Sequence, residues 1–257
     1  MNALMAATTH SLVAENFSRF ADSYDNYAQI QRLGLPLIVR QLHQLAPALV
    51  AGPVLEIGCG TGFLSIHLLS LLQDRKIVLT DISAEMLSQC SKQIVRHFGA
   101  VDADVTLEIL DASRLSERNK FALITSSFSL QWLPDCGDAI ERQYEALVPG
   151  GTIALSFPCA GSFAEWQDAA QRANCPFTGN ALPDPLVVEA KLRALGAKPA
   201  VIRQPLTVTF SSAFEFFRSI KRCGAGTSMR GSSCTLMEFR HLCRELEDRT
   251  TGAVSMT

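Results

Sequence analysis

The chain has 257 residues, of which 47% are hydrophobic and 19% are charged. This composition is typical of a globular α/β protein with a large core and excludes a disordered chain. The 23 basic and 25 acidic side chains give a formal net charge of −2, so no overall basic field favours nucleic-acid binding.

No apolar run approaches the roughly 18 residues of a membrane span, and the first ten residues lack the basic and apolar regions of a secretion signal. The eight cysteines form no CxxC motif, and the five histidines form no HxxH or HExxH motif. We therefore expect a cytoplasmic protein with reduced, buried thiols, no metal site, no disulfide framework and no membrane contact. The expected oligomeric state is a monomer.

Residues 15–47 are predicted to be helical. Phe17, Phe20, Tyr24 and Tyr27 recur at intervals of three, four and three residues, the period of an amphipathic helix. A second helix is expected over residues 35–45, with Pro36 in its first turn. Because these helices precede the first strand, residues 1–48 are predicted to form an N-terminal helical lid on the core.

From residue 53 onward, strands and helices are predicted to alternate. The expected strands are 54–57, 77–80, 105–110, 121–126 and 152–157. The expected helices are 63–72, 84–98 and 137–147. Ser83 and Asp135 are predicted N-caps, Gly99 follows the second of these helices, and the turn at 149–151 ends the third. This alternation predicts a doubly wound, mostly parallel, Rossmann-like sheet whose ligand lies at the carboxyl edge.

After residue 157 the alternation is less regular, and residues 49–257 are expected to form one domain with helical cap segments at about 158–184 and 211–235. Residues 158–184 are predicted to be an insertion with one short helix. Further helices are expected at 185–195, 212–223 and 236–246, with a Gly/Ser-rich loop at 224–233. A strand is predicted at 201–210. Residues 251–257 are expected to enter a final strand that pairs with it at the edge of the sheet.

The segment Gly58-Cys59-Gly60-Thr61-Gly62 joins the first predicted strand to the helix that follows it. Its glycines let the backbone approach a ligand closely. The third glycine is one residue too early for the dinucleotide fingerprint GxGxxG, and no GxxxxGK[ST] motif is present, so pyrophosphate and triphosphate ligands are disfavoured.

Three carboxylates accompany this turn. Asp81 lies 19 residues after Gly62, where an acidic group can accept hydrogen bonds from a ribose diol. Asp111 ends the third strand, where it can accept from an adenine amino group. Glu56 lies inside the first strand and needs a partner, either the backbone amides of the glycine turn or an amine of the ligand.

These residues, together with the segment 147–151, resemble the class I S-adenosylmethionine-dependent methyltransferases over about residues 50–157. Three further segments, 20–31, 126–132 and 217–225, resemble the malonyl-[acyl-carrier protein] O-methyltransferase family within that class. The resemblance implies S-adenosyl-L-methionine as cofactor, S-adenosyl-L-homocysteine as product, and methylation of the free carboxylate of malonyl-acyl-carrier protein in biotin synthesis. The implied partner is an acyl carrier protein carrying malonyl-phosphopantetheine.

The resemblance also implies which residues form the site. The expected cofactor-binding residues are Tyr24, Gln31, Glu56, Gly58, Cys59, Gly60, Asp81, Ile82, Asp111, Ala112 and Ser127. The expected substrate-binding residues are Trp132, Arg218, Lys221 and Arg222, with Arg230 as a weaker candidate. The three basic residues at 218, 221 and 222 share one helix face, suited to the malonyl carboxylate, the carrier's acidic surface or its phosphate.

No catalytic acid or base is expected, because a carboxylate is already ionised at pH 7. Two other functions remain open from the sequence. One is a small-molecule methyltransferase acting on another carboxylic acid or on a quinone precursor. The other is a non-catalytic S-adenosylmethionine-binding module.

Overall fold

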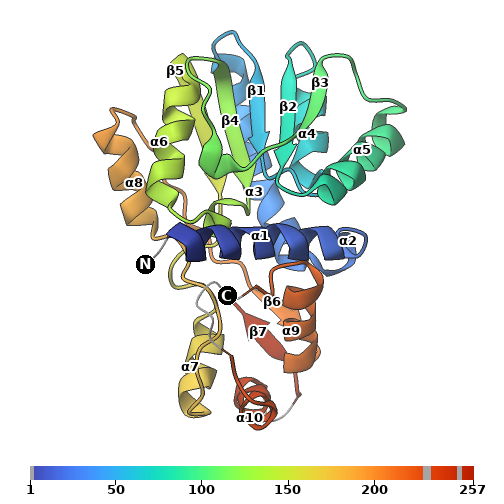
Figure 1. The fold of residues 1–257 in the computed structure, drawn as a ribbon, viewed down its shortest axis with the longest axis vertical. Coiled ribbons are helices and arrows are strands. Elements are labelled where there is room, and N and C mark those ends of the chain that lie inside the picture. The colour runs from blue at the N-terminus through green and yellow to red at the C-terminus, as the bar shows by residue number, and fades with distance from the viewer. Residues whose placement is uncertain (1–2, 228–232, 248–250) are drawn as a thin grey trace.

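A five-stranded parallel sheet forms the centre of the computed structural model, which describes residues 3–227, 233–247 and 251–257 (Figure 1). The strands are β1 (Val54–Ile57), β2 (Ile77–Asp81), β3 (Val105–Ile109), β4 (Phe121–Ser127) and β5 (Leu147–Ser156). Their order is β3-β2-β1-β4-β5 with every pairing parallel. The strand order reverses beside β1, which makes the carboxyl ends of β1 and β4 the expected ligand position.

Helices cover both faces of this sheet, which confirms the predicted doubly wound α/β fold. On one face, α3 (Gln29–Leu45), α4 (Phe63–Leu71) and α5 (Ala84–Phe98) share a core with β1 and β2. On the other face lie α6 (Cys136–Ala146) and α8 (Pro185–Ala194). All four residues of β1 are buried, as expected for a strand covered on both sides.

The predicted helix signals in this domain are confirmed. The Ser83 hydroxyl accepts a hydrogen bond from the Met86 backbone N–H at 3.1 Å, and Gly99 follows α5 with φ of +84°. The Asp135 carboxylate accepts from the N–H groups of residues 137 and 138 at the start of α6. These caps satisfy backbone groups that a helix end leaves unpaired.

The N-terminal segment forms α1 (Ala3–Phe20), the one-turn α2 (Tyr24–Tyr27) and α3. The predicted separate helix beginning at residue 35 is wrong, because Pro36 lies inside the continuous helix α3. Gly34, Ile38 and Leu42 are buried at intervals of four residues along this helix. Their packing on the core outweighs the local preference of proline for a first turn.

The turn predicted at residues 149–151 lies within strand β5, which begins at Leu147 rather than at Thr152. The register of β5 against β4 shifts between Phe121 and Leu123. Pro149 therefore occupies an irregular part of an edge strand, the position in a sheet where a missing N–H is tolerated.

A smaller lobe contains α7 (Ala164–Arg172), α9 (Ala213–Arg222), α10 (Leu236–Leu246), β6 (Val208–Phe210) and β7 (Val254–Met256). The predicted pairing of the last segment with residues 201–210 is present, since β6 and β7 are antiparallel. Its predicted position at the edge of the main sheet is wrong, because β6 and β7 form a separate two-stranded sheet. Their buried side chains pack with α7 and α9, and residues 201–207 are not in a strand.

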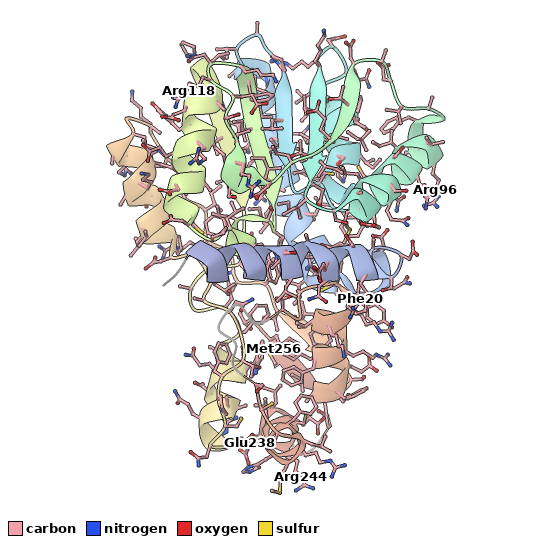
Figure 2. The ribbon with its side chains drawn as sticks, viewed as in Figure 1. Phe20, Arg96, Arg118, Glu238, Arg244 and Met256 are labelled. Atoms are coloured by element: carbon pink, nitrogen blue, oxygen red, sulfur yellow. The ribbon has the colours of Figure 1, made fainter. Side chains whose placement is uncertain are left out.

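The helices α1 and α2 lie between the main sheet and the smaller lobe (Figure 1). Phe17 on α1 packs against Trp132 at the carboxyl edge of the sheet, with ring centroids 5.4 Å apart. On the lobe side, Phe17 lies so close to Gly224 that a Cβ there would be 2.7 Å from its ring. Phe20 lies at the same junction (Figure 2). We refer to α1 and α2 as the lid.

Candidate cofactor site

The glycine turn between β1 and α4 has the backbone geometry that only glycine adopts readily. Gly58 and Gly60 have φ values of +67° and +56°. A Cβ at Gly58 would lie 2.4 Å from the Ser129 hydroxyl, whereas a Cβ at Gly60 would have no atom within 4 Å. Gly58 therefore permits close packing beneath the turn, while the space beside Gly60 is open.

The Asp81 carboxylate holds this turn in place. Its two oxygens accept hydrogen bonds from the backbone N–H groups of Gly60 and Ser83, each at 2.9 Å. Burial raises the pKa of Asp81, while these backbone hydrogen bonds act in the opposite direction. Each carboxylate oxygen has a second lone pair, so the predicted role in binding a ribose diol remains compatible with this geometry.

Glu56 is the second buried carboxyl group at the turn, with 1% of its surface exposed. Burial raises its pKa to about 8, and the hydrogen bond from Ser65 partly offsets this effect. The Ser65 hydroxyl on α4 donates to Glu56 Oε2 at 2.7 Å. The predicted partnership with backbone amides of the turn is wrong, because this side chain on the following helix supplies the hydrogen bond.

A small cavity of about 30 Å³ lies beside the turn, with room for no more than a few water molecules. It brings together seven predicted cofactor residues from four parts of the chain: the lid and α3, β1, the turn and β4. These seven residues are Tyr24, Gln31, Glu56, Gly58, Cys59, Gly60 and Ser127. Four further lining residues were missed by the sequence analysis: Leu35, Thr61, Phe63 and Leu64.

Tyr24 of the lid and Gln31 of α3 form one side of this cavity. The Tyr24 ring centroid lies 6.1 Å from that of Phe63 in the first turn of α4. Burial raises the pKa of the Tyr24 hydroxyl, and the nearby Cys223 and Asp81 act in the same direction. Burial raises the pKa of the Cys223 thiol, and the nearby Gln31 side chain partly offsets this effect.

Four predicted cofactor residues, Asp81 among them, lie at the same edge of the sheet but do not line this cavity. Ile82 follows β2 directly. Ala112 is buried in the one-turn 3-10 helix after β3. The Asp111 carboxylate caps that helix by accepting from the Ser113 N–H at 2.9 Å, and it lies 3.4 Å from the Arg114 guanidinium.

The predicted substrate residues divide between two places. Trp132 is at the sheet edge, where Phe17 of the lid covers it. Arg218, Lys221 and Arg222 are exposed on α9, on the far side of the lid from the glycine turn (Figure 1). None of these four lines the small cavity. Arg230 lies outside the described residues.

Both arginines on α9 contact aromatic rings of the lid. The Arg218 guanidinium carbon lies 5.9 Å from the Tyr27 ring centroid, and that of Arg222 lies 5.9 Å from the Phe20 ring centroid. Arg218 also forms an ion pair with Glu215 at 2.8 Å. These contacts orient the basic face of α9 along the outer side of the lid.

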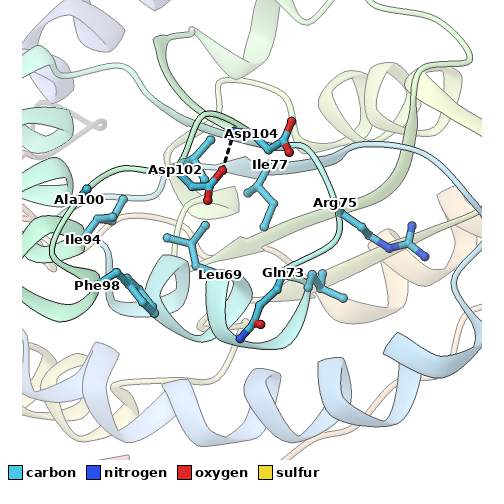
Figure 3. A pocket seen from close by; sticks show the side chains of 11 residues that line it. Leu69, Gln73, Arg75, Ile77, Ile94, Phe98, Ala100, Asp102 and Asp104 are labelled. Carbon is cyan, nitrogen blue, oxygen red and sulfur yellow. Dashed lines mark hydrogen bonds between the residues drawn. The ribbon is translucent and has the colours of Figure 1, made fainter.

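A larger cavity of about 320 Å³ lies at the opposite edge of the sheet, beside the first residues of β2 and β3 (Figure 3). Its walls include the apolar side chains Leu69, Ile94 and Phe98. Arg75 at its rim already donates to backbone carbonyls of residues 49, 50 and 52. This cavity lies at the amino ends of the strands, whereas the glycine turn lies at their carboxyl ends, so the cavity is not part of the candidate cofactor site.

No group of three or more His, Cys, Asp or Glu side chains in the described ranges is arranged to hold a metal ion. All eight cysteines are free, three of them buried and five partly buried. Across residues 3–227, 233–247 and 251–257, no helix combines the length and apolar character needed to cross a membrane.

Comparison with known proteins adds sequence relatives and structural neighbours. A family model described as a methyltransferase domain matches residues 55–153. The malonyl-[acyl-carrier protein] O-methyltransferase of Magnetococcus marinus is 30% identical over 219 residues, which cover 83% of this chain and 76% of that protein. The enzyme of the same name from Erwinia billingiae is 30% identical over 239 residues, which cover 93% of this chain and 89% of that protein.

Solved structures share the fold at lower identity. The YcgJ protein from Bacillus subtilis superposes with a TM-score of 0.60 at 15% identity, covering 85% of this chain and 93% of that one. Phosphoethanolamine N-methyltransferase 2 from Haemonchus contortus, in complex with phosphomonomethylethanolamine and S-adenosylhomocysteine, gives a TM-score of 0.55 at 16% identity. It covers 90% of this chain and 55% of that one.

Proposed function

Because the chain belongs to the malonyl-[acyl-carrier protein] O-methyltransferase family, we propose that it methylates the free carboxylate of malonyl-acyl-carrier protein, with S-adenosylmethionine as methyl donor, in an early step of biotin synthesis. The observation that carries the proposal is the acidic glycine turn. There Glu56 and Asp81 lie beside Gly60, at the point where the strand order reverses.

The residues present fit this cofactor. When bound, S-adenosylmethionine supplies a methyl group on a positively charged sulfur, with an ammonium group in the same half of the molecule. The ionised forms of Glu56 and Asp81 are costly while the site is buried without a cation, so a cationic ligand stabilises them. Asp81 and Asp111 would accept hydrogen bonds from the nucleoside, and the open space beside Gly60 would allow close approach.

The substrate carboxylate needs no general base, because ordinary carboxyl groups are ionised at pH 7. A carboxylate oxygen forms the new bond to the methyl carbon while the carbon–sulfur bond breaks and its electron pair stays on sulfur. The protein's contribution is to orient the two reactants and to exclude water. Tyr24 of the lid and Gln31 of α3 lie beside the turn, and Trp132 lies at the adjacent part of the sheet edge.

The exposed basic face of α9 is suited to a carrier protein rather than to the malonyl carboxylate itself. Lys221 and the two arginines face solvent, and the lid lies between them and the glycine turn. A carrier with an acidic surface would dock on this face by charge complementarity. Its phosphopantetheine arm would then span the distance to the sheet edge.

The test is transfer of labelled methyl from S-adenosylmethionine to three acceptors: malonyl-carrier protein, acetyl-carrier protein and malonyl-coenzyme A. We expect label on the malonyl-carrier protein and none on the acetyl form, which lacks a free carboxylate. Equal labelling of the malonyl and acetyl forms would refute carboxylate methylation. Labelling of malonyl-coenzyme A with none on the carrier would refute the carrier as substrate.

A further inference from the structure

A lid carboxylate joins two parts of the cofactor domain. Asp25, on α2, accepts a hydrogen bond at Oδ1 from the Thr61 hydroxyl at 2.6 Å. Its other oxygen, Oδ2, accepts from Gln93 Nε2 at 2.8 Å. Thr61 is a buried residue of the glycine turn, and Gln93 lies on α5. Asp25 therefore ties the lid directly to the turn that is expected to hold the cofactor.

Other contacts fasten the lid along the same helix of the domain. The hydroxyl groups of Ser18 and Ser83 are 2.9 Å apart, and Gln89 donates to the Asp22 carboxylate. These contacts join the lid to α5 and its N-cap. Asp25 additionally contacts the glycine turn, through Thr61. Asp25 is also adjacent in sequence to Tyr24, whose side chain lines the cavity at that turn. The hydrogen bonds of Asp25 therefore hold the backbone next to Tyr24.

With the lid in this position, the cavity beside the turn measures about 30 Å³. That space holds a few water molecules and is far smaller than the amino-acid half of a nucleoside thioether. Phe17 of the lid also covers Trp132. Movement of the lid would therefore widen this space for ligand to enter and for the demethylated product to leave.

We propose that Asp25 is a positioning residue that latches the lid over the glycine turn and thereby sets the rate of cofactor and product exchange. The inference rests on the proposed function for the identity of the ligand. The latch consists of two hydrogen bonds to an ionised carboxylate, a class of bond that is stronger than a neutral one. Opening the lid breaks both bonds, while the transferring groups at the sheet edge are untouched.

The variant that tests the latch is Asp25→Asn, which keeps the shape and the oxygen that accepts from Thr61. It removes the charge and presents an amide N–H to the Gln93 amide. Adding Gln93→Glu supplies a carboxylate that accepts from the new amide, with Arg96 already within hydrogen-bond distance of position 93 at 3.0 Å. The double variant therefore restores a charged latch in reversed polarity. The matched control is Asn26→Ala, at an exposed neighbour on the same helix.

The measurement is release of labelled S-adenosylhomocysteine from the full chain after dilution into excess unlabelled compound. We expect Asp25→Asn to release it about 10–100-fold faster than wild type, because the charge-assisted part of the latch is lost. The double variant is expected to return most of the way to the wild-type rate, and Asn26→Ala to match wild type. In turnover assays, Asp25→Asn is expected to raise KM for S-adenosylmethionine without lowering kcat.

Hydrogen–deuterium exchange of residues 21–28 without ligand provides a readout that does not depend on the ligand. Exchange is expected to be faster in Asp25→Asn and slower again in the double variant. Unchanged exchange and release in Asp25→Asn, or failure of Gln93→Glu to restore them, would overturn the latch. If wild type bound no S-adenosylhomocysteine while the exchange data followed the expected order, the proposed function would fail and the latch would stand.

Discussion

Replacing Glu56 by Gln is expected to remove a large pH dependence from the stability of this protein. The ordinary pKa of a glutamate is near 4.5, and burial raises that of Glu56 to about 8. At a pH between these two pKa values, Glu56 is protonated in the folded protein and ionised in the unfolded chain. The free energy of unfolding therefore falls as the pH rises from about 4.5 to about 8, and stays level above that range.

The size of the effect follows from the same two values. Each tenfold change in proton affinity is worth about 1.4 kcal/mol, so the full displacement corresponds to about 5 kcal/mol at most. Glutamine cannot ionise, and its carbonyl oxygen can still accept the hydrogen bond from Ser65. We therefore expect Glu56→Gln to be close to wild type in stability at pH 5 and about 2–5 kcal/mol more stable at pH 9.

The assay is urea denaturation of both proteins at pH 5, 7 and 9 without ligand, with Glu108→Gln as the control at an exposed glutamate. The informative quantity is the difference between wild type and variant at each pH, because other groups titrate equally in both. A difference that stays constant from pH 5 to pH 9 would refute the assignment of Glu56 as a buried, protonated carboxyl. Saturating S-adenosylmethionine is expected to stabilise wild type more than the variant at pH 8, since its ammonium group favours the ionised carboxylate.

Three further predictions concern the glycine turn, α3 and α9. Asp81→Ala is expected to weaken S-adenosylmethionine binding by about 1–3 kcal/mol by calorimetry, because the charge-assisted hydrogen bonds that hold the turn are lost; unchanged affinity would place the ribose elsewhere. Gly34→Ala is expected to lower the free energy of unfolding by about 1–3 kcal/mol, since its Cβ would lie 2.5 Å from the Phe128 ring; a thermal melt identical to wild type would contradict that packing. Reversing two charges, in Lys221→Glu with Arg222→Glu, is expected to slow methylation of malonyl-carrier protein more than tenfold in low salt, with little effect on malonyl-coenzyme A, and equal slowing of both would remove α9 as the docking face.

The strands and helices of the main domain could be predicted because the sequence patterns that specify them are local. Strand β1 is a short apolar run that ends at a glycine turn, and helix α5 buries residues 86, 87, 90 and 94 at helical spacing. The caps at Ser83 and Asp135 follow from side chains that satisfy helix N–H groups within three residues. The glycine turn was recognisable for the same reason, since its backbone conformation depends on the residues that form it.

Contacts between distant segments could not be predicted from local sequence patterns. The partner of Glu56 is Ser65, a residue with no motif of its own, and Asp25 meets Thr61 only because the lid crosses the sheet edge. The basic face of α9 was predicted as a unit from its helical spacing. The sequence did not indicate that the lid separates this face from the glycine turn, because that arrangement depends on tertiary contacts.

The sequence by itself determined the parallel α/β domain, the acidic glycine turn and the order of its strands and helices along the chain. Tertiary structure decided that Pro36 lies inside a helix, that β6 and β7 leave the main sheet for a second lobe, and that the lid closes over the turn. The difference has one physical cause. Hydrogen bonds within a turn or helix involve neighbours, whereas burial of Ile38, Phe210 or Met256 depends on which distant apolar surfaces they meet.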